Sequence, residues 1–448
     1  MTMQRRIEQL TGHVAGKRAA GTVGALFSRR QPDDQQAGVK FAKSRHGQCV
    51  PIRIAAADGG QVFGQTRAGR TIGGVDKRRH GGDVSMQSMR KNWDIFCRVI
   101  DNYGDIGVCW RLARQLVSEH DVAVRLWVDD LASLQALCPG IDVDCDQQHL
   151  AEIDVCRWHA AFPHVLPADV VIEAFACELP AGYLQAMSGC AIAPVWINLE
   201  YLSAESWIEG CHALASPHPN LPLVKHFFFP GFTPRSGGLL RERELLSARS
   251  VFQKNLPPRE GLEISLFCYD SAPLPALLDA WRTDARPIRC RVPAGKPLAS
   301  MRRLLGGDGP WETGSLRIDP LPFLSQADYD RLLWSCDLNF VRGEDSFLRA
   351  QWAAVPFVWQ IYPQADDAHL GKLDAFLDRY LDGLAEIDRN ATRHFFQAWN
   401  GNGSVETAWP EFASSLPRLR AHGMHWAEQL AKQSDLAGNL LNFCAKRL

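Results

Sequence analysis

The sequence lacks the features of a membrane protein, a disulfide-stabilised protein or a zinc protein. No run approaches the 18 consecutive apolar residues expected of a membrane-spanning helix. The 13 cysteines are odd in number, and no two stand in a C-x-x-C spacing, which argues against a disulfide framework and a zinc site. Buried free thiols are typical of a reducing compartment. We therefore expect a cytoplasmic protein with no bound metal.

A strong net charge is also missing. The formal net charge of the 448 residues is -1, so no overall field attracts the chain to nucleic acid or to a membrane. The average conceals an asymmetry, because residues 1–90 carry 16 Lys and Arg against 6 Asp and Glu. The same segment holds 14 of the 36 glycines and none of the 14 tryptophans. Its short apolar runs show no sustained period, which is typical of a segment that does not fold by itself.

This basic segment, which we place at residues 1–91, has three interpretations. It has no apolar core of the kind that a secretory signal requires. An Arg-rich, acid-poor leader resembles a transit peptide in composition, although this one is long and rich in glycine. The alternatives are a disordered basic tail, for instance an arm that binds nucleic acid, and a translation start at Met86 or Met89. We favour the later start.

The turn after the first expected strand lacks the G-x-G-x-x-G of a dinucleotide-binding fold. The stretch "WDIFCRVIDNYGDIGVCWRLARQL" (93–116) predicts a strand over 94–100 followed by a helix. The helix has an apolar stripe of period 3.6, formed by Ile106, Cys109, Trp110, Ala113, Leu116 and Val117. The turn instead contains Asp101 and Asp105, whose carboxylates would repel a phosphate at the place where a dinucleotide-binding turn presents backbone amides. Two carboxylates suit a cationic acceptor and the removal of its proton, although Asp105 could instead cap the helix as its N-cap residue.

Strands separated by helices continue along the chain and predict an α/β fold of two Rossmann-like domains facing each other across a cleft, the GT-B architecture. We place the first domain at residues 92–245, a polar linker at 246–261 and the second domain at 262–420. A helical segment at 421–448 completes the chain and could pack back on the first domain. Expected strands are 122–128, 169–175, 193–199, 262–269, 287–293, 315–321, 336–342 and 355–363.

A second candidate site lies in "FVRGEDSFLRAQWAAVPFVWQIYPQ" (340–364). We expect a strand to end at Arg342, Gly343 to turn the chain, and a helix to begin near Asp345. The first amides of that helix, with Ser346 and the Arg342 guanidinium, could bind a diphosphate. The alternative is that Asp345 or Ser346 only caps the helix.

These stretches, with "RLWVDDL", "WINLEYLSAESW", "FFFPGFT" and "LFCYD", resemble the EarP family from about Trp93 to the C-terminus. That resemblance implies an inverting GT-B glycosyltransferase without a cofactor or metal. The enzyme would move L-rhamnose from dTDP-β-L-rhamnose to one arginine of bacterial elongation factor P, which relieves ribosome stalling at proline runs. Elongation factor P would be its protein partner. Neither nucleic acid nor a membrane would be a partner.

The resemblance also implies roles for individual residues. Asp101 and Asp105 match the family's two essential loop aspartates, with Asp105 our choice for the base and Asp101 for positioning, and Glu344 matches a further functional carboxylate. The remaining residues match contacts to the sugar, the thymine base and the diphosphate: Asn102, Tyr103, Gly104, Phe267, Tyr269, Phe323, Gln326, Arg342, Gly343, Asp345 and Ser346. Without the resemblance, Phe267 and Tyr269 have the spacing of one strand face and would be interpreted as core.

Three alternatives remain open at this level. A GT-B enzyme with a lipid-linked or peptidoglycan acceptor would need a membrane-facing patch, and no such amphipathic run is present in the first domain. A non-catalytic nucleotide-sugar-binding regulator would keep Phe267, Tyr269 and Arg342 but would not need Asp101 and Asp105. The stretch "KHFFFPGFT" (225–233) is either a buried strand end or an exposed docking loop.

A chain that starts at Met89 should melt at the same temperature as the full chain. The segment before it is predicted to bury too little apolar surface to offset the roughly 1–2 kcal/mol of backbone entropy that each ordered residue loses. Calorimetry of both proteins checks this, and limited proteolysis of the full chain should cut first before Trp93. A lower melting temperature for the shortened chain would make the segment part of the folded domain.

Overall fold

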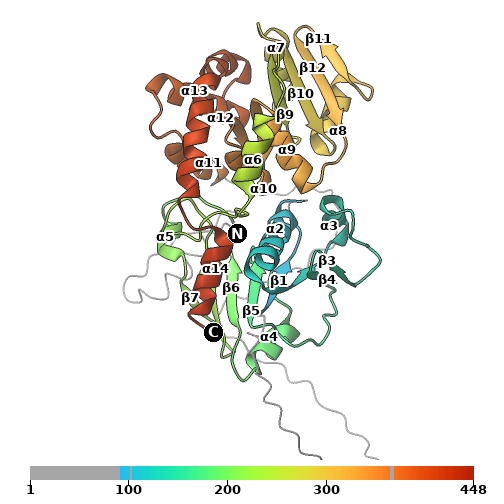
Figure 1. The fold of residues 1–448 in the computed structure, drawn as a ribbon, viewed down its shortest axis with the longest axis vertical. Coiled ribbons are helices and arrows are strands. Elements are labelled where there is room, and N and C mark those ends of the chain that lie inside the picture. The colour runs from blue at the N-terminus through green and yellow to red at the C-terminus, as the bar shows by residue number, and fades with distance from the viewer. Residues whose placement is uncertain (1–90, 101–102, 364–367) are drawn as a thin grey trace, which may run out of the picture. The chain divides into compact units, whose positions relative to one another are not determined.

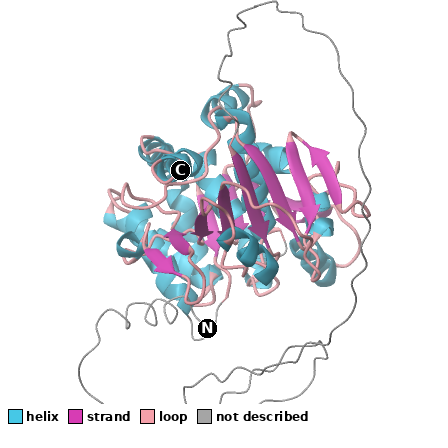
Figure 2. Ribbon diagram, turned by 90° about the horizontal axis from the view of Figure 1, so that it is seen from below, coloured by secondary structure: helices cyan, strands magenta, loops and turns pink. Residues whose placement is uncertain are grey.

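Two separate β-sheets organise the described part of the chain, one of eight strands and one of six (Figures 1 and 2). The structure is a computed structural model that describes residues 91–100, 103–363 and 368–448. The predictions for the segment 1–90 and for Asp101 and Asn102 fall outside these residues and stay predictions. Within the described residues, no helix is long and apolar enough to cross a bilayer.

The first sheet has the strand order β3-β4-β2-β1-β5-β6-β8-β7. It is parallel except for the antiparallel pairs β3–β4 and β7–β8 at its two edges. Its strands are β1 (Asn92–Cys97), β2 (Ala123–Val128), β3 (Gln147–Leu150), β4 (Ile153–Arg157), β5 (Val170–Ala174), β6 (Val195–Leu199), β7 (Ala215–Pro217) and β8 (Val224–Phe228).

Helices cover both faces of this sheet, as Figure 2 shows. The helices of this half are α2 (Gly104–His120), α3 (Leu131–Leu137), α4 (Ala181–Ser188) and the short α5 (Ile208–Cys211). The predicted apolar stripe of α2 is confirmed, since its members from Ile106 to Leu116 are buried. The opposite sheet face carries an aromatic cluster that includes Phe96, Trp127, Tyr183 and Trp196. Burial on both faces accounts for the almost continuous apolar runs in the strands.

The second sheet has the order β11-β12-β10-β9-β13-β14 and is parallel except for the edge pair β11–β12. Its strands are β9 (Leu262–Leu266), β10 (Ile288–Pro293), β11 (Trp311–Thr313), β12 (Leu316–Leu321), β13 (Leu338–Arg342) and β14 (Phe357–Gln360). The helices of this half are α6 (Leu245–Lys254), α7 (Leu274–Arg282), α8 (Lys296–Leu305), α9 (Gln326–Ser335), α10 (Asp345–Ala353), α11 (Ala368–Tyr380), α12 (Glu386–Trp399) and α13 (Val405–Ala431).

The last helix, α14 (Leu436–Ala445), returns to the first sheet (Figure 1). The ring of Phe443 lies 5.3 Å from that of His226 and 5.6 Å from that of Phe228, both on β8. The Leu436 amide donates to the Leu239 carbonyl at 2.9 Å. The chain thus crosses between the two halves twice, once before α6 and once after α13. The boundary predicted between residues 420 and 421 falls inside α13.

Three local predictions differ from the structure or are decided by it. The first strand ends at Cys97 rather than Ile100, because the next amides bond side chains: Val99 donates to Asp129 and Ile100 to Asp105. The predicted linker 246–261 contains most of α6, a helix that packs against α9. The triple phenylalanine is a buried strand end, since Phe228 and Phe229 are each 1% exposed. The exposed docking loop is therefore excluded.

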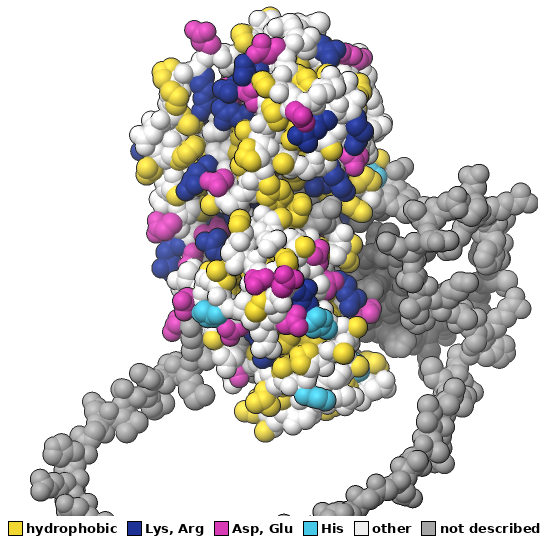
Figure 3. Space-filling model, turned by 90° about the vertical axis from the view of Figure 1, so that its right-hand side faces the viewer, with side chains coloured by type: hydrophobic (Ala, Val, Ile, Leu, Met, Phe, Trp, Pro, Cys, Tyr) yellow, Lys and Arg dark blue, Asp and Glu magenta, His cyan; other side chains and the backbone are white. Residues whose placement is uncertain are grey.

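The surface shows no concentration of one charge on the face drawn in Figure 3, where acidic and basic side chains are interspersed. The charges that matter for the architecture are buried. Asp330 on α9 accepts two hydrogen bonds from Arg349 on α10, at 2.9 and 2.7 Å. Two more come from Arg111 on α2, at 3.1 and 3.2 Å. Glu242, from the segment that joins the two halves, accepts from Arg349 at 2.6 Å. This buried ion network, formed by Arg111, Glu242, Asp330, Asp345 and Arg349, connects the first half of the chain to the second.

Glu242→Gln should lower the melting temperature near neutral pH, and the difference from wild type should shrink as the pH falls. Burial opposes ionisation, but Arg349 and Arg111 outweigh it and lower the pKa of Glu242 to about 2. Because the pKa of Glu242 is lower in the folded state than in the unfolded state, its ionised form stabilises the fold at pH values above the unfolded-state pKa of roughly 4.3. This stabilisation is lost as the pH falls through the folded-state pKa. Thermal unfolding at several pH values between about 7 and 2 checks it.

The exposed Glu260 provides the control, because Glu260→Gln should change the melting temperature little at any pH. A difference between Glu242→Gln and wild type that stays constant down to pH about 2 would contradict the ion pairing.

Candidate functional site

Two adjoining cavities lie where α2 meets the turn between β13 and α10. The larger cavity has a volume of about 210 Å³ and the smaller cavity about 90 Å³. Gly104, Gly343 and Glu344 line both. Since Gly104 is the first residue of α2, the start of that helix faces the strand-helix turn of the second sheet. The two segments singled out from the sequence therefore meet at one place.

Asp105 is held from two sides at the edge of the larger cavity. Its Oδ2 accepts from the Ile100 amide at 2.9 Å, and its Oδ1 accepts from the Tyr201 hydroxyl at 3.2 Å. It is not the N-cap residue of α2, as the sequence had suggested. That position belongs to Tyr103, which makes no side-chain cap bond. Asp105 is the second residue of the helix, where the positive end of the dipole favours a carboxylate.

Tyr201 is a site residue that sequence reasoning missed. Its ring stacks on Phe175 with centroids 4.4 Å apart and an interplanar angle of 14°. Burial and the carboxylates of Asp105 and Glu344 raise the pKa of the Tyr201 phenol. It therefore stays protonated and donates to Asp105 at any physiological pH. The unusual stretch "WINLEYLSAESW" was the only signal for it.

Glu344 lies at the junction of the two cavities. Its Oε2 accepts from the Leu202 amide at 3.1 Å, although Leu202 follows β6 in the first half and Glu344 follows β13 in the second. Asp105 and Glu344 both line the larger cavity. The carboxylates of two domains therefore border one space, as a cationic acceptor would require.

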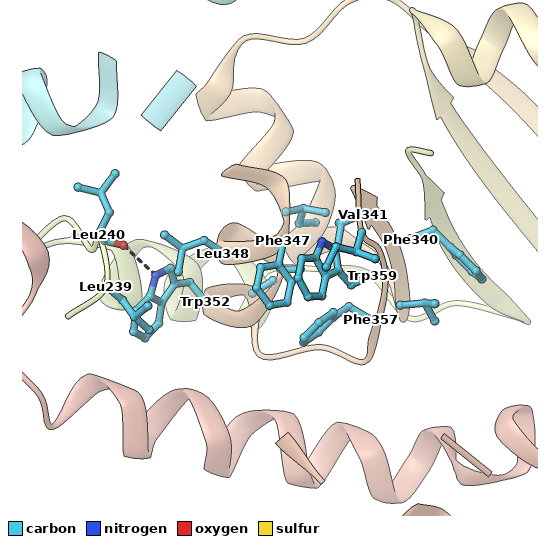
Figure 4. Close-up of a cluster of buried hydrophobic side chains, with 14 of the residues drawn as sticks. Leu239, Leu240, Phe340, Val341, Phe347, Leu348, Trp352, Phe357 and Trp359 are labelled. Atoms are coloured by element: carbon cyan, nitrogen blue, oxygen red, sulfur yellow. Dashed lines mark hydrogen bonds between the residues drawn. The ribbon is translucent and has the colours of Figure 1, made fainter. Parts of the chain in front are cut away.

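The rest of the larger cavity is mainly apolar. Phe347 and Trp359 stack with centroids 3.9 Å apart and planes at 15° (Figure 4). Phe232 and Phe376 complete this wall, and all four side chains are at most 7% exposed. Trp359 Nε1 donates to the Gly343 carbonyl at 2.8 Å. This bond holds the turn in which Gly343 has a φ of 59°, a left-handed conformation that favours glycine.

The smaller cavity gathers most of the predicted donor residues. Its lining includes Tyr103, Gly104, Phe267, Phe323, Gln326, Arg342, Gly343, Glu344, Asp345 and Ser346. Tyr269 is not part of this lining, although its ring contacts the Arg342 guanidinium. Asp101 and Asn102, the two other predicted residues of this region, lie outside the described residues.

Of the two arginines that line this cavity, Arg111 pairs with carboxylates and Arg342 lies against aromatic rings. Its guanidinium carbon lies 4.5 Å from the ring centroids of both Phe267 and Tyr269, so each ring contacts the cation. The side chain is buried, and its Nη1 has no hydrogen-bond partner among the described residues. A buried donor of this kind calls for an acceptor, and a phosphate oxygen is one that a guanidinium binds well.

Ser346 and Gln326 shape the cavity around Arg342. The Ser346 hydroxyl accepts from the Arg342 amide at 3.1 Å and donates to the Arg342 carbonyl, so it closes the turn between strand and helix. Gln326 Nε2 donates to the Gly107 carbonyl at 3.0 Å, while its Oε1 has no partner in the described part of the chain. That oxygen can accept from an N–H group of a bound base.

Asp345, the first residue of α10, lines the smaller cavity and also binds Arg111. Arg111 Nε donates to Asp345 Oδ1 at 2.9 Å. Burial raises the pKa of Asp345, against the opposing effect of Arg111 and Arg349. In the described part of the chain, no group of three or more His, Cys, Asp or Glu could hold a metal ion. The absence of a metal and of a cofactor from the reaction stays a prediction.

Comparison with known proteins identifies the relatives of this chain. A family model described as "Elongation-Factor P (EF-P) rhamnosyltransferase EarP" matches residues 93–445. Relatives named protein-arginine rhamnosyltransferase in Pseudomonas putida and Pseudomonas aeruginosa are 49% and 46% identical over 374 residues, which cover 79% of this chain and 99% of each relative.

A solved structure described as "Structural basis for EarP-mediated arginine glycosylation of translation elongation factor EF-P" is also similar. It is 36% identical, with a TM-score of 0.56, and the match covers 80% of this chain and 100% of that one. The predicted GT-B architecture of two Rossmann-like domains is confirmed.

Phe267→Ala should weaken the binding of dTDP, the nucleotide that the resemblance implies, by about tenfold or more. The substitution removes a ring that lines the smaller cavity and supports Arg342, and an aromatic stacking contact contributes about 1–3 kcal/mol. Titration calorimetry with dTDP measures the loss.

Phe252→Ala is the matched control, because Phe252 packs against Trp334 on α9 and lines neither cavity. Unchanged affinity in a folded Phe267→Ala protein would show that the ring serves packing alone.

Proposed function

The chain belongs to the EarP family of rhamnosyltransferases, and we propose that it transfers L-rhamnose from dTDP-β-L-rhamnose to the guanidinium of one arginine of elongation factor P, with inversion at the anomeric carbon. It is a glycosyltransferase that acts on protein arginine. One observation carries the finer proposal. Asp105 and Glu344 border a mainly apolar cavity, next to a cavity in which Arg342 has a buried nitrogen without a partner in the described residues.

The larger cavity suits a guanidinium as acceptor. A free guanidinium has a pKa of roughly 13.8 and delocalised lone pairs, so it is a weak nucleophile in water. Two carboxylates can bind it with paired hydrogen bonds and orient one nitrogen. The apolar wall of Phe347, Trp359 and Phe376 strengthens these bonds, because charges interact more strongly away from water.

The smaller cavity suits the donor. Arg342 would bind the diphosphate through its unpartnered nitrogen, and the first amides of α10 would add the positive end of a helix dipole. Phe267, Phe323 and Gln326 would hold the thymine. The sugar would then lie near Gly104, Gly343 and Glu344, where the two cavities join.

The transfer is a single displacement. The oriented arginine nitrogen attacks the anomeric carbon, a C–N bond forms, and the C–O bond to dTDP breaks with its electron pair leaving on the diphosphate. Asp105 takes the proton that the nitrogen loses. The Ile100 amide and the Tyr201 hydroxyl hold the Asp105 carboxylate while it does so. Arg342 and the N-terminus of α10 stabilise the charge on the leaving dTDP. Asp101 would position the acceptor.

The proposed acceptor places the reaction in the cytoplasm, where elongation factor P works in translation. Modification of its arginine would relieve ribosome stalling at runs of proline. Nothing beyond the donor and the protein acceptor is needed in this scheme, which uses no cofactor.

Asp105→Asn should reduce transfer to elongation factor P by at least ~100-fold, the usual scale for a positioned base, and should leave dTDP binding nearly unchanged. The donor residues lie in the second domain, apart from the turn at Gly104. The intact mass of elongation factor P, after incubation with the protein and dTDP-rhamnose, should rise by one deoxyhexose residue with wild type and at least ~100-fold more slowly with Asp105→Asn.

Asp130→Asn is the control and should transfer like wild type. Asp130 is also an aspartate at the start of a helix, but it is the N-cap residue of α3 and lines neither cavity. No mass increase with wild type would refute the proposed donor or acceptor. If Asp105→Asn lost dTDP affinity as much as transfer, Asp105 would have a structural role and would not be the base.

A further inference from the structure

Helix α2, which carries Asp105 in its first turn, has two further residues that contact the second domain. Gly107 and Arg111 are four residues apart and so lie on the same face of the helix. Arg111 follows Asp105 by six residues, about 9 Å along a helix that rises 1.5 Å per residue. Any contact that fixes Arg111 therefore also fixes the first turn that holds Asp105.

The contact at Gly107 is close. Its carbonyl accepts from Gln326 Nε2, and a Cβ at Gly107 would lie 3.3 Å from that nitrogen and 3.5 Å from Asp345 Oδ2. A larger residue would have to displace one of these two side chains. The absence of a side chain lets α2 lie against the wall of the smaller cavity.

Arg111 makes the charged contact one turn further along. Its Nε donates to Asp345 at 2.9 Å, and its two terminal nitrogens donate to the two oxygens of Asp330 at 3.1 and 3.2 Å. The side chain is 4% exposed, with Asp330 at 8% and Asp345 at 16%. A guanidinium can join two carboxylates in this way because its donors form a rigid plane, whereas an ammonium cannot.

The two carboxylates are not equivalent. Asp330 is also bound by Arg349, so it is fixed within the second domain whether or not Arg111 is present. Asp345 is the first residue of α10 and directly follows Glu344, which lines both cavities. In the described part of the chain, the hydrogen bond that holds the Asp345 carboxylate comes from Arg111. Arg111 thus joins the helix that carries Asp105 to the start of the helix that would bind the donor diphosphate.

We propose that Arg111 is a positioning residue of the transfer reaction: it holds Asp345 and the start of α10 against the first turn of α2, and so sets the spacing between the base Asp105 and the donor. This inference rests on the proposed function. It assigns to Arg111 no contact with the acceptor and no proton transfer. Its effect is on geometry, and a displacement of about 1 Å in such a site can cost on the order of 100-fold in rate.

Arg111→Lys and Arg349→Lys form a matched pair of variants. Each variant keeps the positive charge and loses the two parallel hydrogen bonds to Asp330. Only Arg111→Lys also loses the guanidinium hydrogen bond between α2 and Asp345. We expect kcat for transfer to fall by about 10- to 100-fold in Arg111→Lys. Because Arg111 also lines the smaller cavity, dTDP binding is measured beside it, and a loss of dTDP affinity as large as the loss of kcat would assign Arg111 to donor binding instead. Both substitutions should lower the melting temperature by similar amounts. Arg349→Lys, however, should keep kcat within about threefold of wild type.

Hydrogen exchange of the peptide spanning residues 104–115 gives a readout that does not depend on transfer. Its amides should exchange faster in Arg111→Lys than in Arg349→Lys, with dTDP present or absent. Equal kcat values in the two variants, or equal exchange rates in this peptide, would overturn the role of Arg111. If wild type failed to modify elongation factor P, the proposed function would fall, and the exchange comparison would still decide whether Arg111 positions α2.

Discussion

The relative setting of the two domains depends on a buried ion network in which Arg111 and Arg349 share Asp330. Burying charges is costly, and the cost is offset only where donors and acceptors are paired with good geometry. Here both oxygens of Asp330 accept from both guanidiniums, and Glu242 accepts from Arg349. Because Arg111 on α2 pairs with Asp330 on α9 and with Asp345 on α10, the network favours one packing of these three helices.

The two cavities follow from that packing. Asp105 belongs to the first domain and Glu344 to the second, and they border one space only because α2 abuts the turn after β13. Apolar side chains from α10, β14 and α11 form much of the remaining wall. In such surroundings a carboxylate pair selects a cation strongly. The same turn presents Arg342 to the neighbouring cavity. Acceptor activation and donor binding therefore lie on opposite sides of Glu344.

Much of the site could be predicted because its residues are contiguous in sequence. A strand that ends at Arg342, a glycine turn and a helix that begins at Asp345 are local features, and residues at such a junction share one edge of the sheet. The helix after the first strand was equally clear from its period. Tyr269 shows the limit, since alternation along a strand could not tell that its ring contacts the Arg342 guanidinium without lining the cavity.

By itself the sequence determined the alternation of strands and helices, the α/β class and the two segments that bear the chemistry, because these depend on neighbours within a few residues. Only the tertiary structure decided which polar side chains are buried and what they bind. The helical period places Arg111 on the polar face of α2. The side chain is nevertheless buried, because it pairs with Asp345, which is 234 residues away in sequence. Tyr201 reaches Asp105 across 96 residues. A contact between segments so far apart leaves no periodic signal in either one, since it is set by the packing of the two domains.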